Sequence, residues 1–102
     1  MSKWRMTLFQ QKIYIVTAKI LKGQVATYRS IAVLVDRPQA SRAVAQALAQ
    51  NFDPKIPCHR VVRSDGFIGG YNRGGTNQKA KLLRSEGVLV KNNRVESKSI
   101  LL

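Results

Sequence analysis

The sequence contains one cysteine and one histidine, and these two residues, Cys58 and His59, are neighbours. A thiol attacks as its thiolate, and a nearby base or cation favours that form. Adjacent side chains point to opposite faces of a strand and diverge on a helix, so His59 is not expected to touch the Cys58 sulfur directly. A bridging water or an unusual turn would be needed. A lone cysteine is more often a small buried hydrophobe, so adjacency alone does not decide whether Cys58 reacts.

A cysteine–histidine pair also needs a third group that orients the imidazole. The chain offers five carboxylates for this role: Asp36, Asp53, Asp65, Glu86 and Glu96. Their spacing does not choose among them. Glu86 is attractive because it lies where a predicted helix stops, beside Gly87, where it would be held rigidly. The alternative is that Glu86 is a solvated residue at a helix end.

Metal and disulfide chemistry are not expected. A single cysteine cannot form an intramolecular disulfide, which suits a reducing compartment. One cysteine and one histidine are too few for a closed structural zinc site, which needs four such ligands. We therefore expect no metal, and Cys58 is inert, redox-active or nucleophilic.

The charge is strongly positive. Lys and Arg number 18 and Asp and Glu number 5, so the formal net charge is +13. This excess favours a polyanionic partner, most often nucleic acid, although a generic basic protein or a ribosomal protein would look similar. The basic residues are spread along the whole chain, which indicates a charged face of a folded domain.

Length and hydropathy predict one soluble domain. The chain has 102 residues, of which 44% are hydrophobic, enough for one compact core over 1–102. No apolar run approaches the roughly 20 residues that span a bilayer, and the N-terminus does not resemble a signal peptide. We expect a monomer that makes no membrane contact and is cytoplasmic (associated with the nucleoid, or nuclear in a eukaryote), with a frayed end at 97–102.

The first half of the chain predicts helices. Apolar spacing predicts a helix from Thr7 to Leu21, with a face made of Leu8, Phe9, Ile13, Val16 and Ile20. Thr27 is a plausible N-cap for a short helix over 28–34. A break at 36–38, with a proline suited to a first helical turn, precedes an alanine-rich helix over 39–50. Two short helices joined by a tight turn are typical of a helix-turn-helix, although other αα-hairpins look alike.

The second half is rich in loops. Two prolines make 51–57 a loop that leads to Cys58. Residues 64–66 form a predicted turn and 69–75 a glycine-rich loop. A helix is expected over 77–85, with Ala80, Leu82 and Leu83 packed inward, and a small hairpin over 88–95.

The hexapeptide Pro57-Cys58-His59-Arg60-Val61-Val62 resembles the active-site signature of the O6-alkylguanine-DNA alkyltransferases, also called methylated-DNA–protein-cysteine methyltransferases. Five further blocks resemble this family in order: Thr27-Tyr28 with Ile31-Ala32; Ser41-Arg42-Ala43-Val44; Asn51; Ser64-Asp65-Gly66 with Gly69-Gly70-Tyr71; and Lys79 with Leu82-Leu83 and Glu86-Gly87. The resemblance covers about 7–90. It implies a mainly α fold: a winged helix-turn-helix-like C-terminal alkyltransferase domain with a small β-hairpin as its wing.

For the chemistry, the resemblance implies that Cys58 is the alkyl acceptor. His59 would deprotonate Cys58 through a bound water, and Glu86 would orient and stabilise the imidazolium. The acceptor cysteine is not regenerated, so the protein would act once, as a methylated-DNA–protein-cysteine S-methyltransferase without a cofactor.

For the partner, the resemblance implies double-stranded DNA that contains O6-alkylguanine, bound from the minor groove. The damaged base would be flipped out, Arg42 would take its place in the stack, and Tyr28 would press on the adjacent phosphate. Three more residues are expected to contact DNA: Ser41, Ala43 and Arg60. Small side chains would allow close approach to the groove floor: Ala40, Ala43 and Ala47.

For the leaving group, the resemblance implies donors around a guanine anion. Tyr71 would donate to the purine ring, with Lys79 supporting it. The main-chain N–H of Asn72 would face the guanine O6.

The rest of the pocket is also implied by the resemblance. The carbonyls of Cys58 and Val61 would accept from the exocyclic amine, Leu48 would line the wall, and Asn51 would be a hinge ahead of the cysteine. The sequence departs from the family pattern in two places. The segment from Asn51 to Cys58 is slightly shorter, and Asn72 stands where serine is more usual.

Two alternatives stay open. Small alkyltransferase-like members of the wider family replace the cysteine, often with tryptophan, and only bind lesions to mark them for excision repair. The chain could instead be a helix-turn-helix regulator in which Cys58 is structural. Retention of Cys58, His59 and Glu86 favours transfer over sensing, and the blocks around Tyr71 and Glu86 disfavour a regulator.

Overall fold

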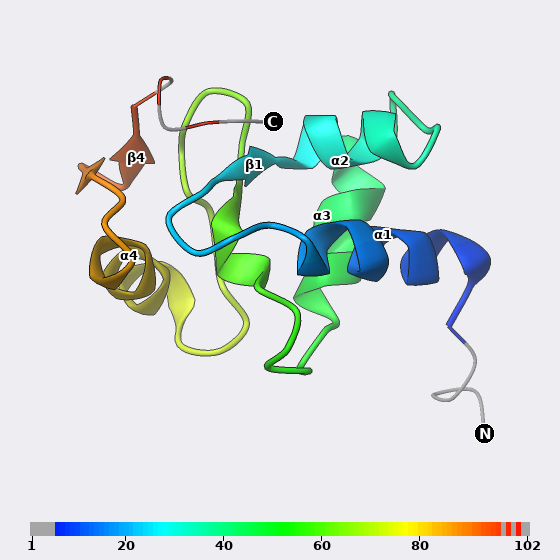
Figure 1. The fold of residues 1–102 in the computed structure, drawn as a ribbon, viewed down its shortest axis with the longest axis horizontal. Coiled ribbons are helices and arrows are strands. Elements are labelled where there is room, and N and C mark those ends of the chain that lie inside the picture. Colours follow the sequence, from blue (N-terminus) through cyan, green and yellow to red (C-terminus); the bar gives the residue numbers. More distant parts are fainter. Residues whose placement is uncertain (1–5, 97, 99, 101–102) are drawn as a thin grey trace.

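The computed structural model describes residues 6–96, 98 and 100, and within them the fold is mainly α (Figure 1). The α-helices are α1 (Leu8–Ala18), α2 (Tyr28–Leu34), α3 (Ser41–Ala49) and α4 (Gly75–Ser85). Short strands are β1 (Ala26–Thr27), β2 (Val61–Val62), β3 (Val90–Lys91) and β4 (Arg94–Val95), and Cys58–Arg60 form a 3-10 helix. None of the described helices is long and apolar enough to cross a membrane. Most of the tail that was predicted to fray, 97–102, lies outside the described residues.

Helix α1 begins at Leu8, one residue after the predicted start, with Thr7 as its N-cap, and it ends before the predicted Leu21. The Thr7 hydroxyl accepts from the Gln10 N–H, and the Gln10 side chain accepts from the Thr7 N–H, which completes a capping box. The helix stops at Ala18, and Gly23, at φ 87°, closes a separate turn after it. The predicted inward face is correct except at Leu8, which is 68% exposed in the first turn.

Helices α2 and α3 form the predicted αα-hairpin. The Thr27 side chain caps α2 by accepting from the Ser30 N–H, so this helix has the predicted bounds. The turn after α2 places Asp36 at φ 61° and lets the Arg37 N–H donate to the Ala32 carbonyl at 2.8 Å. The predicted start of α3 at residue 39 is wrong: Pro38 stays in the turn and the helix begins at Ser41.

A parallel pair of two-residue strands joins the two halves of the molecule. Strand β1 pairs with β2, with Ala26 opposite Val61 and Thr27 opposite Val62. Successive residues of a strand face opposite sides. Val61 therefore packs into the core of α1, α2 and α3, whereas Val62 packs into a second core beneath α4 and the hairpin. This pairing places the residues after Cys58 directly beside the start of α2.

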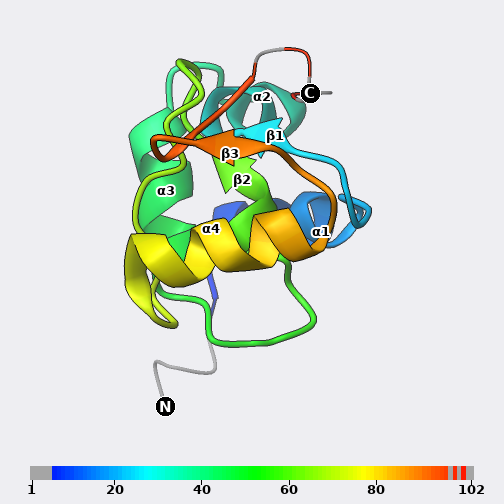
Figure 2. The same cartoon turned by 90° about the vertical axis from the view of Figure 1, so that its left-hand side faces the viewer.

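Helix α4 and the hairpin cover the other side of the strand pair (Figure 2). Strands β3 and β4 are antiparallel, and their turn residues Asn92 and Asn93 both have positive φ, as a tight hairpin turn requires. The predicted hairpin is thus confirmed. Helix α4 begins at Gly75, two residues before the predicted start at Asn77.

Candidate active site

Cys58 lies at the start of the 3-10 helix, at the end of the proline-containing loop 51–57. Its side chain is buried, with 6% exposed. The Cys58 N–H donates to the Ile56 carbonyl at 2.8 Å, and Asn51 Nδ2 donates to the Cys58 sulfur at 3.2 Å. The thiol therefore contacts the amide of the predicted hinge residue, Asn51, and within the described residues no hydrogen bond joins it to His59.

His59 and Arg60 both bind Glu86 at the end of α4. His59 Nε2 lies 3.0 Å from Glu86 Oε2. Arg60 Nε donates to Oε1 at 3.0 Å and Nη2 donates to Oε2 at 2.7 Å. Burial raises the pKa of Glu86, but the hydrogen bonds from Arg60 and His59 outweigh this, and the net shift is downward. Because an ionised carboxylate only accepts, His59 donates from Nε2, and the lone pair of the neutral ring lies on Nδ1.

The pKa shifts of Cys58 and His59 determine the protonation state of the resting site. Burial raises the pKa of Cys58, although the Asn51 amide and the charges of Arg73 and Lys79 lower it in part. Burial lowers the pKa of His59, against the opposing effect of Glu86. At neutral pH the resting site therefore holds a protonated thiol and a neutral imidazole, and both shifts disfavour the thiolate–imidazolium pair before a substrate binds.

A cavity of about 310 Å³ opens beside the sulfur. We call it the thiol cavity. Its lining comes from α2, α3, the 3-10 helix, the glycine-rich loop and α4: Tyr28, Ala45, Leu48, Ala49, Cys58, Gly70, Tyr71, Asn72 and Lys79. The structure thus brings together around one cavity five residues that were predicted for the substrate site or for catalysis: Leu48, Cys58, Tyr71, Asn72 and Lys79.

Lys79 lines the thiol cavity but is buried, with only 1% of its surface exposed. Its Nζ donates to the Val61 carbonyl at 2.8 Å, to the Tyr28 hydroxyl at 3.3 Å and to the Gly70 carbonyl at 3.4 Å. Burial lowers the pKa of Lys79 to about 8. The expectation that Lys79 supports Tyr71 is not met by these contacts, because its hydroxyl partner is Tyr28.

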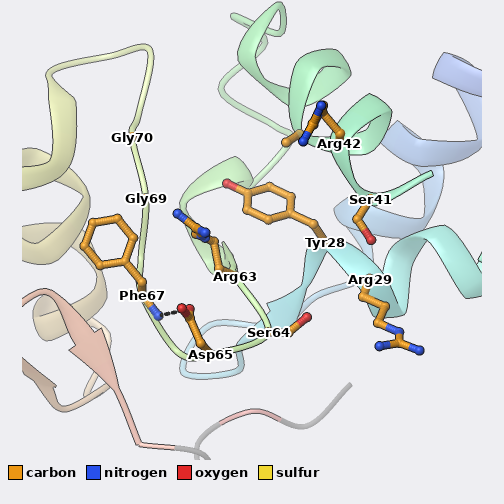
Figure 3. Close-up of a pocket in the computed structure, with 11 residues that line it drawn as sticks. Tyr28, Arg29, Ser41, Arg42, Arg63, Ser64, Asp65, Phe67, Gly69 and Gly70 are labelled. Atoms are coloured by element: carbon orange, nitrogen blue, oxygen red, sulfur yellow. Dashed lines mark hydrogen bonds between the residues drawn. The ribbon is translucent and has the colours of Figure 1, made fainter. Parts of the chain in front are cut away.

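A larger hollow of about 650 Å³ lies next to the thiol cavity and shares Tyr28, Ala45 and Gly70 with it. We call it the arginine hollow. Figure 3 shows the Tyr28 ring between the side chains of Arg42 and Arg63 in this view. The lining residues, drawn from both halves of the fold, are Tyr28, Arg29, Ser41, Arg42, Ala45, Arg63, Ser64, Asp65, Phe67, Gly69 and Gly70.

The predicted DNA-contacting residues fall into two groups. Ser41, Arg42 and Tyr28 line the arginine hollow, where a polyanion could reach them. Arg60 is a correction, because Glu86 and the Ile20 carbonyl, 2.8 Å from Nη1, occupy its guanidinium. Ala43 is half-buried on α3 and is not part of the hollow's lining.

Two further predictions need adjustment. Ala47 is buried in the core, and its carbonyl accepts from the Tyr14 hydroxyl at 2.7 Å, so it cannot approach a groove floor. The Val61 carbonyl already accepts from Lys79, which leaves it one lone pair for any substrate amine.

The sequence reasoning missed two arginines of the hollow, Arg29 and Arg63, and the ion pair between Arg60 and Glu86. Arg63 directly follows the signature hexapeptide, and that position could have drawn attention to it. Across the described chain, no group of three or more His, Cys, Asp and Glu side chains is placed to hold a metal ion.

Comparison with protein families finds one match over most of the chain. Residues 8–88 match the model of the 6-O-methylguanine DNA methyltransferase, DNA binding domain. The chain is similar to the methylated-DNA–protein-cysteine methyltransferase of Rattus norvegicus, with 47% identity over 72 residues. These residues are 69% of this chain and 34% of the rat protein, so the chain spans about a third of that relative's length.

Solved structures are similar over the same region. The S. pombe Atl1 structure, in complex with damaged DNA containing O6-carboxymethylguanine, superposes with a TM-score of 0.84 at 27% identity, over 96% of this chain and 98% of that chain. The Mycobacterium tuberculosis OGT structure, in complex with DNA, superposes with a TM-score of 0.75 at 38% identity, over 80% of this chain and 51% of that chain.

Proposed function

The chain belongs to the 6-O-methylguanine DNA methyltransferase family by its match to the DNA-binding domain, and from that premise we propose that it transfers an alkyl group from O6 of guanine in DNA to Cys58. The observation that carries the proposal is the position of the Cys58 sulfur. It borders a partly open cavity beside a hollow lined by three arginines, and His59, the next residue in the chain, is paired with Glu86.

The arginine hollow supports double-stranded DNA as the partner. The side chains of Arg29, Arg42 and Arg63 offer positive charge to phosphates. A base inside a duplex cannot reach a buried thiol, so the target nucleotide is flipped out through the shared rim and into the thiol cavity. Arg42, exposed on α3, fills the gap in the stack as the protein binds from the minor groove as a monomer.

The base in this reaction is His59. Its Nε2–H is held by Glu86, so Nδ1 is the atom that can take a proton. A water relays the Cys58 proton to Nδ1, since no direct hydrogen bond joins the two side chains in the described structure. Glu86 then stabilises the imidazolium, with its carboxylate already fixed by Arg60.

The transfer is a displacement at the alkyl carbon. The thiolate of Cys58 attacks that carbon, the S–C bond forms as the C–O6 bond breaks, and the electron pair of the broken bond stays on the guanine as an anion. The Tyr71 hydroxyl and the Asn72 main-chain N–H donate to this anion from the cavity wall. The Lys79 ammonium, whose donors bind Val61, Tyr28 and Gly70, contributes its positive charge. The thioether product has no route back to a thiol, so each chain acts once.

A lesion sensor without chemistry is the second candidate. The observation that favours it is the close superposition on S. pombe Atl1, which covers nearly all of both chains. The retained Cys58, the amide on its sulfur and the His59–Glu86 pair favour transfer, because a sensor needs none of them.

The test is the mass of the intact protein after incubation with a duplex that contains O6-methylguanine. Transfer adds one methyl group to the chain, and Cys58→Ser binds the duplex with unchanged affinity and gains no mass. Tight, lesion-selective binding without added mass would establish the sensor. Equal affinity for damaged and undamaged DNA, again without added mass, would indicate a regulator.

A further inference from the structure

The side chain of Asn72 joins two segments that lie far apart in the sequence. Its Nδ2 donates to the Ala49 carbonyl at 2.7 Å and to the Asn51 carbonyl at 2.6 Å. Ala49 ends α3, and Asn51 begins the loop that leads to Cys58. Both N–H donors of one amide group are used, so the amide orientation and the main chain at this corner are fixed together.

The side chain of Asn51, in turn, contacts the nucleophile. Asn51 is buried, and its Nδ2 donates to the Cys58 sulfur at 3.2 Å and to the Asp53 carbonyl at 3.2 Å. The Asp53 N–H donates back to Asn51 Oδ1 at 3.3 Å. A shift of the Asn51 main chain would carry its amide away from the sulfur.

A second side chain of the glycine-rich loop binds the same segment. Arg73 Nη2 donates to the Asp53 carbonyl at 2.9 Å. Its positive charge lowers the pKa of Cys58, although burial, which raises that pKa, and the Asn51 hydrogen bond have larger effects. The glycine-rich loop, which forms one wall of the thiol cavity, therefore binds the segment around Asn51 at two points, through Asn72 and Arg73. This segment positions the Asn51 amide that donates to the Cys58 sulfur.

In the part of the chain that the structure describes, the side-chain oxygen of Asn72 is unpaired, which indicates that the amide nitrogen is the group that holds this side chain in place. Within the described residues, Asn72 Oδ1 is buried and accepts no hydrogen bond. An unpaired buried acceptor is unfavourable, so the two donor contacts alone hold this side chain in place. A serine at this position offers a single, shorter donor and could not bridge both carbonyls.

We propose that Asn72 is a positioning residue for Cys58, which holds the Asn51 amide on the sulfur by bridging the Ala49 and Asn51 carbonyls. This role of Asn72 concerns the same site as the proposed function, and its relevance to DNA repair rests on that function. Because Asn72 and Tyr71 are neighbours in one loop, contact between that loop and a substrate base is coupled to the reactivity of the thiol.

The test uses a small electrophile, iodoacetamide, on the intact chain, whose single cysteine makes every adduct report on Cys58. Intact-mass kinetics across pH give two quantities: the midpoint, which reports stability of the thiolate, and the plateau at high pH, which reports access to the sulfur. Asn72→Ala should raise the midpoint by about half to one pH unit, because the thiolate loses most of one hydrogen bond. Asn77→Ala, on an exposed position of α4, is the matched control and should keep the wild-type midpoint.

The double variant separates positioning from an independent effect. If Asn72 acts through Asn51, Asn51→Ala and the double Asn51→Ala/Asn72→Ala variant share one midpoint. An unchanged midpoint in Asn72→Ala, or shifts that add in the double variant, would overturn the proposal. If circular dichroism shows that Asn72→Ala is unfolded, Asn72→Ser replaces it, with a smaller shift in the same direction expected and no shift counting against the proposal. Since no DNA is present, a failure of alkyl transfer would leave these results unaffected.

Discussion

Replacing Glu86 by glutamine tests how the imidazolium of His59 is stabilised. The carboxylate lies 3.0 Å from His59 Nε2 and is largely buried. A pair of unit charges about 4 Å apart interacts by about 4 kcal/mol at an effective dielectric constant of about 20. Arg60 shares the same carboxylate and offsets part of this, so we expect Glu86→Gln to raise the barrier by about 2–4 kcal/mol. This corresponds to transfer that is roughly 30-fold to 1,000-fold slower.

The assay is the single-turnover rate of methylation of Cys58 by an excess of duplex that contains O6-methylguanine, followed by intact mass. Glu96→Gln is the control, because it makes the same charge change at an exposed ion pair with Lys98. Glu86 lines neither the thiol cavity nor the arginine hollow, so DNA affinity should stay at the wild-type value. A folded Glu86→Gln protein whose transfer rate lies within about threefold of wild type would refute the role of Glu86. Such a rate would mean that the carboxylate lowers the activation barrier by less than about 1 kcal/mol.

Three further outcomes are expected. Thr27→Ala should lower the free energy of unfolding by about 1 kcal/mol in denaturant titrations, because it removes the cap of α2; an unchanged midpoint would show that the cap contributes nothing. The folded pKa of Lys79 is lowered to about 8 from 10.5, so its burial destabilises the fold less as pH rises. The unfolding free energy of wild type relative to Lys79→Met should therefore increase from about pH 8 towards pH 10.5, and a constant difference would contradict the shift. Arg42→Ala should weaken binding to lesion-containing duplex more than to undamaged duplex in anisotropy titrations; an equal loss for both would make Arg42 an ordinary phosphate contact.

Local signals in the sequence predicted the elements whose ends they determine. Thr27 fixes the start of α2 through one side-chain hydrogen bond, and Asn92-Asn93 suit the positive φ values of the hairpin turn. These features depend on residues within a few positions of each other. The parallel pairing of β1 with β2 depends on segments more than thirty residues apart, and two-residue strands are too short to show an alternating pattern.

The site residues divide in the same way. The family resemblance placed Cys58, Tyr71 and Lys79 around one cavity, as the structure has them. It could not show that Arg60 turns away from the surface to bind Glu86, because an arginine in a basic protein suggests a phosphate contact equally well. It also could not show that Lys79 is buried, since a lysine is seldom buried and only the tertiary fold supplies its three acceptors.

The most direct test of Cys58 as a single-use acceptor is the stoichiometry and location of the transferred methyl group. Protein is incubated with a severalfold excess of duplex bearing O6-methylguanine, and the peptide that contains Cys58 is examined by tandem mass spectrometry while repaired guanine is counted. The proposed transfer predicts one S-methylcysteine per chain, located at Cys58, and one guanine restored for each chain. A methyl group on another residue, repair of more than one lesion per chain, or an unmodified Cys58 beside unrepaired DNA would contradict it.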